Sequence, residues 1–374
     1  MTTFRQQLID HFNLMKSHPL FVAMSTTVEA SPWHREANVL VHTEMVVDEY
    51  LKLTDAVRDT PEDWTLTDYL GGLCCVWHDT GKPPARTPKH SPERGDYFAY
   101  HGHELISARL FENYAVSNSI LHVDLDNLFV VEWMIHHHMP WSITDQHKLA
   151  SLKATPFYFG GEALYQAYTR ALLADQFGRF ADDQEGKNAS ASAWVEKLNN
   201  TTDTVTPTLY AGSITMTDRP VMIMPIGPSG AGKSTLFKNY VQSIDGKTFE
   251  SYSLDALRHR YYDATDYAKA YQKSVEDSSF ESRAKQEFMK MVKAGGNIYI
   301  DNTNLSAKRR AFYISEAKRR NYVVVGFHLT SSIELLKSRQ RTRGDKTVPD
   351  GAVYQQYMAL TVPSIGEFDS INVV

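Results

Sequence analysis

The chain has 374 residues, a formal net charge of −5 at pH 7, and 42% hydrophobic and 22% charged residues. This length suits two domains of about 100–200 residues each, and the composition is that of an ordinary globular protein. No apolar run approaches the roughly 18 residues that span a membrane, and the first residues lack the pattern of a signal peptide. The two cysteines, Cys74 and Cys75, are adjacent and have no other partner, so we expect a cytoplasmic protein that does not engage a membrane.

Charge and histidine are unevenly distributed. Residues 304–346 contain eleven Lys/Arg and three Asp/Glu, a local charge of +8, which leaves about −13 for the rest of the chain. A local site for an anionic substrate would explain this patch, and solvated helix faces would explain it equally well. Thirteen of the fifteen histidines occur at or before His147, so metal ligation is the first hypothesis to test for that half.

The N-terminal part is predicted to be helical. Apolar residues recur at spacings of three and four in segments 39–53, 66–77, 105–111, 128–139 and 164–177. One His-Asp pair, His78-Asp79, follows the second segment, where Gly81 and Pro83 indicate a helix end. Neighbouring residues within a helix rarely share a metal, but at a helix end the backbone can turn and let both side chains converge.

Further histidines and a late aspartate accompany this pair. In order, the set is His42, His78-Asp79, His103, His138 and Asp175. It resembles the HD phosphohydrolase superfamily over about residues 39–179. The resemblance implies an all-α fold in which one divalent metal is held by His42, His78, Asp79 and Asp175. It also implies that His103 and His138 hold a second metal, with Asp79 bridging the two.

Mixed histidine and carboxylate ligands favour an octahedral ion such as Mn²⁺, Fe²⁺, Ni²⁺, Co²⁺ or Mg²⁺ over a cysteine-rich zinc site. Such an ion lowers the pKa of bound water and neutralises phosphate charge. Lys82 is a candidate catalytic residue that would stabilise developing negative charge, or else a surface lysine. Because neighbouring helical positions cannot all face one metal, we assign His138 as the ligand rather than His136 or His137. His101 is expected to be exposed or outside the ligand shell. His34, upstream of the His42 helix, could approach the substrate, but we expect it to lie away from it.

Residues 181–208 are rich in Asp, Asn, Ser, Ala and Thr, and residues 181–217 are predicted to form a connector. A short helix over 191–198 and a short strand over 209–217 are possible within or beside it. The predicted domains are therefore residues 1–180 and 218–374.

The C-terminal part has a different pattern. Segments 221–226, 297–300 and 322–328 are predicted strands, and 234–244 and 306–321 are predicted helices. Strands that alternate with helices predict an α/β domain with a parallel sheet covered on both faces.

A glycine-rich loop follows the first of these strands. Residues 227–234 read Gly-Pro-Ser-Gly-Ala-Gly-Lys-Ser and satisfy the phosphate-loop pattern G-x-x-x-x-G-K-[ST]. The backbone N–H groups surround phosphate oxygens, Lys233 reaches the β- and γ-phosphates, and the Ser234 hydroxyl coordinates Mg²⁺. The predicted nucleotide-binding residues are Gly227, Ser229, Gly230, Gly232, Lys233, Ser234 and Thr235.

Three further features concern the phosphate acceptor. Asp255, near the end of an expected strand, could accept a proton from an attacking hydroxyl while Arg258 holds an anion beside it. Alternatively, Asp255 caps a helix and Arg258 is a surface residue. Asp301 could lie near Mg²⁺ or cap the next helix. Residues 339–349, Arg-Gln-Arg-Thr-Arg-Gly-Asp-Lys-Thr-Val-Pro, could form a lid whose arginines clamp the transferring phosphoryl group.

Together, the loop, the Asp-x-x-Arg at 255–258, the Asp-Asn-Thr-Asn strand end and the lid resemble the 5′-hydroxyl polynucleotide kinase family, over about residues 221–349. The resemblance implies that Asp255 is the general base and that Arg258 contacts the acceptor's phosphate. It also implies that Arg343, with Arg339 at the donor phosphates, is the lid arginine; Arg341 matches no family position.

The combination of both halves resembles the bifunctional HD-Pnk type of end-healing enzyme. It implies end healing of a nucleic acid, with RNA expected, by NTP-dependent phosphorylation of 5′-OH ends and metal-dependent removal of 2′,3′-cyclic or 3′-phosphates. The expected partners are RNA or DNA ends and, functionally, a polynucleotide ligase; the sequence leaves a homo-oligomer open. Two alternatives remain: a nucleoside or metabolite kinase joined to a nucleotide phosphohydrolase, and a nucleotide-sensing regulator with a degenerate HD half.

Overall fold

The computed structural model describes residues 2–29, 34–92, 95–120, 122–202, 205, 217–244, 246–262, 266–343 and 347–374. The chain divides into two compact units, Met1–Val205 and Thr206–Val374. The division falls within residues 181–217, where we expected a connector. Residues 209–216 of the strand considered there lie outside the described residues.

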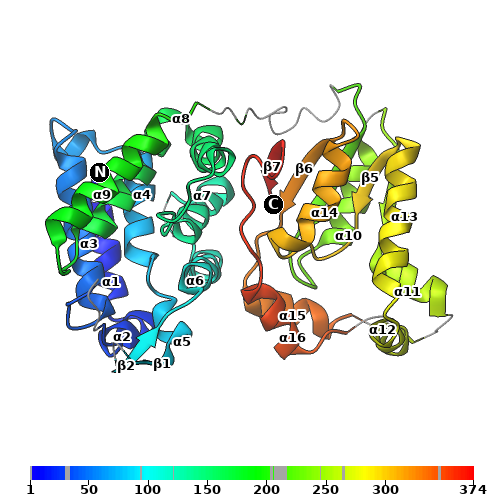
Figure 1. The fold of residues 1–374 in the computed structure, drawn as a ribbon, viewed down its shortest axis with the longest axis horizontal. Helices are drawn as coiled ribbons and strands as arrows, with labels where there is room; N and C mark the ends of the chain where they lie inside the picture. The colour runs from blue at the N-terminus through cyan, green and yellow to red at the C-terminus, as the bar shows by residue number, and fades with distance from the viewer. Residues whose placement is uncertain are drawn as a thin grey trace. The chain divides into compact units, whose positions relative to one another are not determined.

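The first unit consists of helices and one two-stranded hairpin (Figure 1). Its elements are α1 (Phe4–Met15), α2 (Pro19–Ser25), α3 (Val39–Asp55), the 3₁₀ turn η1 (Pro61–Asp63), α4 (Leu66–Trp77), α5 (Lys82–Ala85), β1 (Thr87–Ser91), β2 (Gly95–Ala99), α6 (His103–Asn118), α7 (Leu125–His136), α8 (Gln146–Phe177) and α9 (Gln184–Asn199). The helical prediction for this half is confirmed, and segment 66–77 has the predicted bounds.

Helix α4 lies at the centre of this unit. It begins with a capping box in which Thr65 and Asp68 exchange hydrogen bonds, and every residue from 68 to 77 is buried. It packs against α1, α3, α7 and α8, so apolar side chains all around it are buried. Because α4 ends inside the unit, the residues that follow it, His78 and Asp79, are buried too.

The predicted connector requires a correction in its first part. Residues 184–199 form α9, which packs against α8 and contributes Ala191, Val195 and Leu198 to the core. These residues are four and three positions apart, so they form one narrow apolar stripe on an otherwise polar helix. Helix α8 itself is kinked at Gly160 and Gly161, and only its second part was predicted.

The second unit is a five-stranded sheet with helices on both faces (Figure 1). Every strand pair is parallel, in the order β4 (Phe249–Tyr252), β5 (Asn297–Ile300), β3 (Val221–Ile226), β6 (Val323–His328) and β7 (Ser370–Val373). The other elements are α10 (Lys233–Asn239), the 3₁₀ turn η3 (Val241–Ser243), α11 (Leu254–Tyr262), α12 (Tyr267–Glu276), α13 (Phe280–Ala294), α14 (Ala307–Lys318), α15 (Ile333–Arg341) and α16 (Asp350–Met358). The predicted α/β fold with a parallel sheet is confirmed.

Alternate strand residues face opposite layers of helices. Ile223 of β3 belongs to a buried cluster with Leu336 of α15 and Val353 of α16. On the other face, Tyr252 of β4 packs its ring against Phe288 of α13. Because the strands are parallel, their carboxyl ends meet at one edge of the sheet, where such folds bind ligands.

None of the helices in the described parts of the chain combines the length and the apolar character that crossing a membrane requires.

Candidate active sites

The glycine-rich loop connects β3 to α10 and lines a cavity of about 780 Å³. Gly230 and Gly232 have φ of +92° and +107°, a left-handed region that favours glycine. A Cβ on Gly230 would lie 2.8 Å from Nε2 of Gln340 and 3.1 Å from the Leu336 carbonyl oxygen, so the loop is also closely packed. Helix α10 begins at Lys233, which gives the loop the strand-before, helix-after context that phosphate binding requires.

The same cavity is lined by the predicted kinase residues except Gly227 and Arg258. Besides the loop, its lining includes Ser234, Thr235, Ser253, Asp255, Asp301, Asn302, Arg339 and Arg343. Asp255 follows β4, Asp301 follows β5, and the two arginines belong to the end of α15 and the residues after it. The parallel sheet thus brings residues more than 100 positions apart to one opening.

Lys233 and Arg339 both contact the loop backbone. The Nζ of Lys233 donates hydrogen bonds to the carbonyl oxygens of Gly227, at 3.0 Å, and Pro228, at 2.7 Å. The Nη1 of Arg339 donates to the Gly230 carbonyl oxygen at 3.1 Å. Two cations therefore lie against the loop that is predicted to surround phosphate.

Asp255 is held by two donors. Its Oδ1 accepts a hydrogen bond from Nη1 of Arg258 at 2.5 Å and from the Tyr267 hydroxyl at 3.0 Å. Arg258 also donates from Nε to the Ser274 hydroxyl oxygen at 3.0 Å. Of the two predicted partners, only Asp255 lines the cavity; Arg258 stands beside it.

The segment after β5 has a structural role as well. The Asn304 side chain donates to the carbonyl oxygens of Pro225, Ile300 and Asn302, and Asn304 itself has φ of +50°. Asn302 accepts the Leu254 N–H at 3.0 Å, which connects this strand end to the start of α11. Asp301 lines the cavity, as the Mg²⁺ reading requires, and does not cap α14, whose cap is Ser306.

Sequence reasoning missed three residues of this site. The Gln356 side chain accepts the Ser229 N–H at 2.8 Å, and the Tyr299 hydroxyl donates to the Lys233 carbonyl oxygen at 2.6 Å. Tyr267 is the third. Each lies far along the chain from its partner or on a separate helix, and no short motif contains it. Lid residues 344–346 lie outside the described residues.

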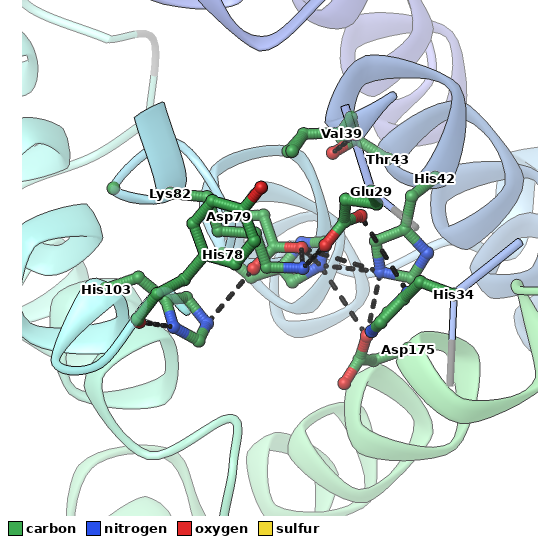
Figure 2. Close-up of polar contacts among 12 residues, drawn as sticks. Glu29, His34, Val39, His42, Thr43, His78, Asp79, Lys82, His103 and Asp175 are labelled. Atoms are coloured by element: carbon green, nitrogen blue, oxygen red, sulfur yellow. Dashed lines mark hydrogen bonds and ion pairs between the residues drawn. The ribbon is translucent and has the colours of Figure 1, made fainter. Parts of the chain in front are cut away.

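In the first unit, the residues after α4 are the centre of a histidine and carboxylate cluster (Figure 2). His78 is the C-cap of α4, and the chain turns there as Gly81 and Pro83 predict. Asp79 is buried, and its two carboxylate oxygens face two different groups of histidines.

The first group lies on the side of Oδ2 of Asp79. The Nε2 atoms of His78 and His42 are 3.2 and 3.5 Å from this oxygen and 3.4 Å from each other. Oδ1 of Asp175 lies 3.2 Å from Nε2 of His42 and 3.6 Å from Nε2 of His78. All four residues that the family resemblance assigns to the first metal therefore converge.

The second group lies on the side of Oδ1 of Asp79. Nε2 of His103 is 3.2 Å from this oxygen, and Nε2 of His138 is 3.8 Å from it. The two Nε2 atoms are 3.2 Å apart. Asp79 thus stands between both groups, in the position expected of a bridging ligand.

The outer nitrogens of three of these rings are fixed by the backbone. Nδ1 contacts the carbonyl oxygen of Cys75 in His78, of Tyr100 in His103 and of Ile135 in His138, at 2.8, 2.8 and 2.7 Å. A carbonyl oxygen can only accept a hydrogen bond, so each Nδ1 carries a hydrogen and each Nε2 is the ring nitrogen that faces the centre. This is the arrangement found around metal-ligating histidines.

Charges around Asp79 favour its ionised form. Burial alone would raise the pKa of Asp79, but His78 and Lys82 beside it hold that pKa well below its usual range. Nζ of Lys82 lies 2.7 Å from Oδ2 of Asp79 and 2.5 Å from Oε1 of Glu29. Lys82 is therefore buried against the centre rather than exposed, and Glu29 is a participant that sequence reasoning missed.

His34 lies beside the metal-ligand cluster. Its ring centroid is 4.8 Å from that of His42, and its Nδ1 is 3.5 Å from Oε2 of Glu36. Glu36 also lies beside the outer nitrogen of His42, with Oε1 3.4 Å from Nδ1. His101 is exposed, as one of its two readings had it.

The three consecutive histidines at the end of α7 separate as expected. His138 joins the cluster, whereas His137 stacks on Trp133 with ring centroids 4.3 Å apart. His136 is the last residue of α7 and belongs to none of the described metal-ligand groups.

Comparison with known proteins bears on the second unit. Residues 222–363 match a family model described as an AAA domain. A search of curated proteins found no match for the chain. The matched segment contains β3 from its second residue on, the glycine-rich loop, Asp255, Asp301 and both arginines of the cavity. The C-terminal unit is therefore a P-loop, kinase-like nucleotide-binding domain.

Proposed function

We propose that this protein heals broken polynucleotide ends, and that each unit acts on one end. The C-terminal unit would transfer the γ-phosphoryl group of a nucleoside triphosphate to a 5′-hydroxyl. The N-terminal unit would remove a 2′,3′-cyclic phosphate or 3′-phosphate. The observation that carries the proposal is the shared cavity of Lys233, Ser234 and Asp255, because it pairs a phosphate donor site with a carboxylate base.

The kinase step follows from these residues. Asp255 accepts the proton of the 5′-hydroxyl as its oxygen attacks the γ-phosphorus, and the bond to the β-phosphate oxygen breaks. Lys233 moves from the loop carbonyls to the donor's phosphates, and Arg339 and Arg343 neutralise charge on the transferring group. Mg²⁺, held by the Ser234 hydroxyl with Asp301 nearby, would supply further charge neutralisation.

The N-terminal cluster fits one or two divalent cations. His42, His78, Asp79 and Asp175 would hold one, and His103 and His138, with Asp79 bridging, a second. Support comes from the converging Nε2 atoms and from the carbonyl groups that orient three of the rings. When bound, such ions supply an acidified water and electrophilic stabilisation of phosphate oxygens. Lys82 would hold its charge beside the developing anion.

The two activities would together prepare broken strands for ligation. Strands cut to leave a 5′-hydroxyl and a 3′-phosphate cannot be joined by ligases that require a 5′-phosphate and a 3′-hydroxyl. Both corrections together produce ligatable ends, so a polynucleotide ligase would be the functional partner. A 2′,3′-cyclic phosphate requires the 2′-hydroxyl of RNA, whereas a 5′-hydroxyl and a 3′-phosphate can end either RNA or DNA.

Separation of the two activities tests the proposal. An oligonucleotide with a 5′-hydroxyl and a 2′,3′-cyclic phosphate is incubated with ATP, Mg²⁺ and Mn²⁺, and both ends are analysed. Asp79→Asn should abolish the 3′ reaction and leave 5′ phosphorylation intact, and Asp255→Asn should do the reverse. The proposal is wrong if the wild-type protein changes neither end, or if free nucleosides outcompete the oligonucleotide as acceptors.

A further inference from the structure

Helix α12 presents one face to the predicted base. Tyr267, Tyr271 and Ser274 are four and three positions apart, so they lie on the same side of this helix. The Tyr267 hydroxyl donates to Asp255, and the Ser274 hydroxyl accepts from Arg258. This face is therefore in direct contact with the two residues assigned to the acceptor.

Tyr271 lies between these contacts but remains open to solvent. The centroid of its ring is 5.0 Å from the guanidinium carbon of Arg258 and 6.2 Å from the ring centroid of Tyr267. Its exposed fraction is 48%, and Val275, one turn further along, is 67% exposed. The Tyr271 ring packs beside a cation and is about half exposed. Its exposed apolar surface could be covered by another planar group.

Tyr271 is not needed to hold Arg258 in position, so that role does not explain why the Tyr271 ring is exposed. Arg258 is already fixed by Asp255, by Ser274 and by the ring of Phe280, whose centroid is 5.4 Å from the guanidinium carbon. The side chain of Arg258 is only 15% exposed. A smaller residue than tyrosine at position 271 would leave these three contacts in place.

The order of the residues matches the order of groups on a nucleotide chain. Asp255 takes the 5′-hydroxyl, Arg258 the first phosphate, and Tyr271 stands next to Arg258 on the exposed side. Bases stack on such aromatic rings in proteins that hold single strands, and arginine contacts strengthen this binding.

We propose that Tyr271 is a stacking platform for a nucleobase at the 5′ end of a single-stranded polynucleotide acceptor. This inference rests on the proposed kinase function of the same site. Because every base has a π-face, the platform accepts all four bases and sets how tightly the end binds rather than which sequence is chosen.

The test measures 5′ phosphorylation by the full chain with two kinds of single-stranded acceptor. One is an intact oligonucleotide; the other is a pair of oligonucleotides that lack the base of the first or of the second nucleotide. Variants Tyr271→Ala and Tyr271→Phe are compared with wild type. Tyr354→Ala is the matched control, since Tyr354 of α16 is 46% exposed and does not line the cavity.

Tyr271→Ala should raise KM for the intact oligonucleotide about tenfold, the effect of one lost base stack, with kcat and KM for ATP nearly unchanged. Tyr271→Phe and Tyr354→Ala should behave like wild type. For the wild-type protein, KM should be about tenfold higher for one of the two abasic acceptors than for the intact oligonucleotide. The Tyr271→Ala substitution should not raise KM for that abasic acceptor any further.

Two results would overturn the inference. Either Tyr271→Ala leaves KM for the intact oligonucleotide unchanged, or it raises KM equally for the intact and for both abasic acceptors. In both cases the wild-type protein still phosphorylates the oligonucleotide, so the proposed function survives. If wild type phosphorylates no oligonucleotide, the proposed function fails and this inference fails with it.

Discussion

Oε1 of Glu29 lies 2.5 Å from Nζ of Lys82, and both side chains are buried. Burial alone would lower the pKa of Lys82, but Asp79 and Glu29 outweigh burial and raise it. The ammonium group therefore keeps its charge beside the metal-ligand cluster. Glu29 acts through Lys82 as a positioning residue, since it holds Nζ at the edge of Asp79.

Glu29→Gln should reduce the 3′ reaction about tenfold, because a neutral amide replaces a charge-assisted contact that is roughly twice as strong. The reduction should appear in kcat, with 5′ phosphorylation unchanged. The matched control is Glu49→Gln, which breaks an exposed pair with Lys52. Equal rates of the 3′ reaction for Glu29→Gln and wild type would show that Lys82 does not depend on its contact with Glu29.

Removal of one histidine should change the number of bound metal ions. After incubation with Mn²⁺ and gel filtration, the wild-type protein should retain two ions per chain, and His138→Ala should retain one, because the group at Oδ1 of Asp79 loses a ligand. Elemental analysis measures this without an enzymatic assay. His90→Ala, in the exposed hairpin, is the control. If His138→Ala still bound two ions per chain, His138 would not be a ligand of the second metal.

Tyr267→Phe should lower kcat for 5′ phosphorylation about three- to tenfold, since one hydrogen bond that orients Asp255 is lost. KM for ATP should not change. Tyr262→Phe is the matched control, because its hydroxyl also donates to an aspartate, Asp277, at 2.9 Å, but outside the cavity. If both variants lose activity equally, the effect comes from general loosening of this region and not from Asp255.

Gly230→Ala should abolish ATP binding and spare the 3′ reaction. The new Cβ would crowd Gln340 and strain a backbone with φ of +92°. Gly295→Ala is the control, because its backbone has a similarly strained φ of +78° but its added Cβ would have no atom within 4 Å. Each substitution should cost about 1 kcal/mol of stability from strain, so ATP binding measured by calorimetry separates loop damage from destabilisation. Normal ATP affinity in Gly230→Ala would contradict the assigned role of the loop.

The N-terminal unit should lose stability as pH falls below about 6.5. Burial lowers the pKa of His11 to about 4, and His11 accepts the N–H of Trp77. Between these values the unfolded chain binds a proton that the folded chain does not, so stability decreases as pH falls, and the loss is complete only below pH 4, where both states bind the proton. At pH 5 this amounts to about 2 kcal/mol.

Tryptophan fluorescence can follow this unit separately, because all six tryptophans precede residue 205. His11→Gln keeps a hydrogen-bond acceptor but does not titrate, so its melting temperature should fall less than that of wild type between pH 7 and 5. His147→Gln, at an exposed position, should behave as wild type. An equal decrease in His11→Gln and wild type would exclude His11 as the cause.

The glycine-rich loop and the order of the histidines were readable from the sequence because their chemistry depends on residue type and short spacing. The loop needs Gly227, Gly232 and Lys233 in a fixed order after a strand, and that order is local. In the first unit, the family order predicted six residues that the structure brings together, although they span positions 42 to 175.

The residues that sequence reasoning missed depend on tertiary contacts. Glu29 meets Lys82 across 53 positions, and Gln356 meets Ser229 across 127. Strand β7 has only four residues and is placed by pairing with β6. Helix α9 lies within the predicted connector, where only a short helix over 191–198 was considered, because three buried residues in sixteen leave a weak apolar pattern. In each case, the packing partner and not the local pattern decides the outcome.

The two cysteines have a practical consequence. Cys74 and Cys75 are both buried in α4, and burial raises the pKa of both thiols, so neither is poised to react with maleimides at neutral pH. A cysteine introduced at exposed Val275 would then be the one thiol that a dye modifies. Placed one turn from Tyr271, that dye would report in real time when a strand end arrives at α12, without any change to the native cysteines.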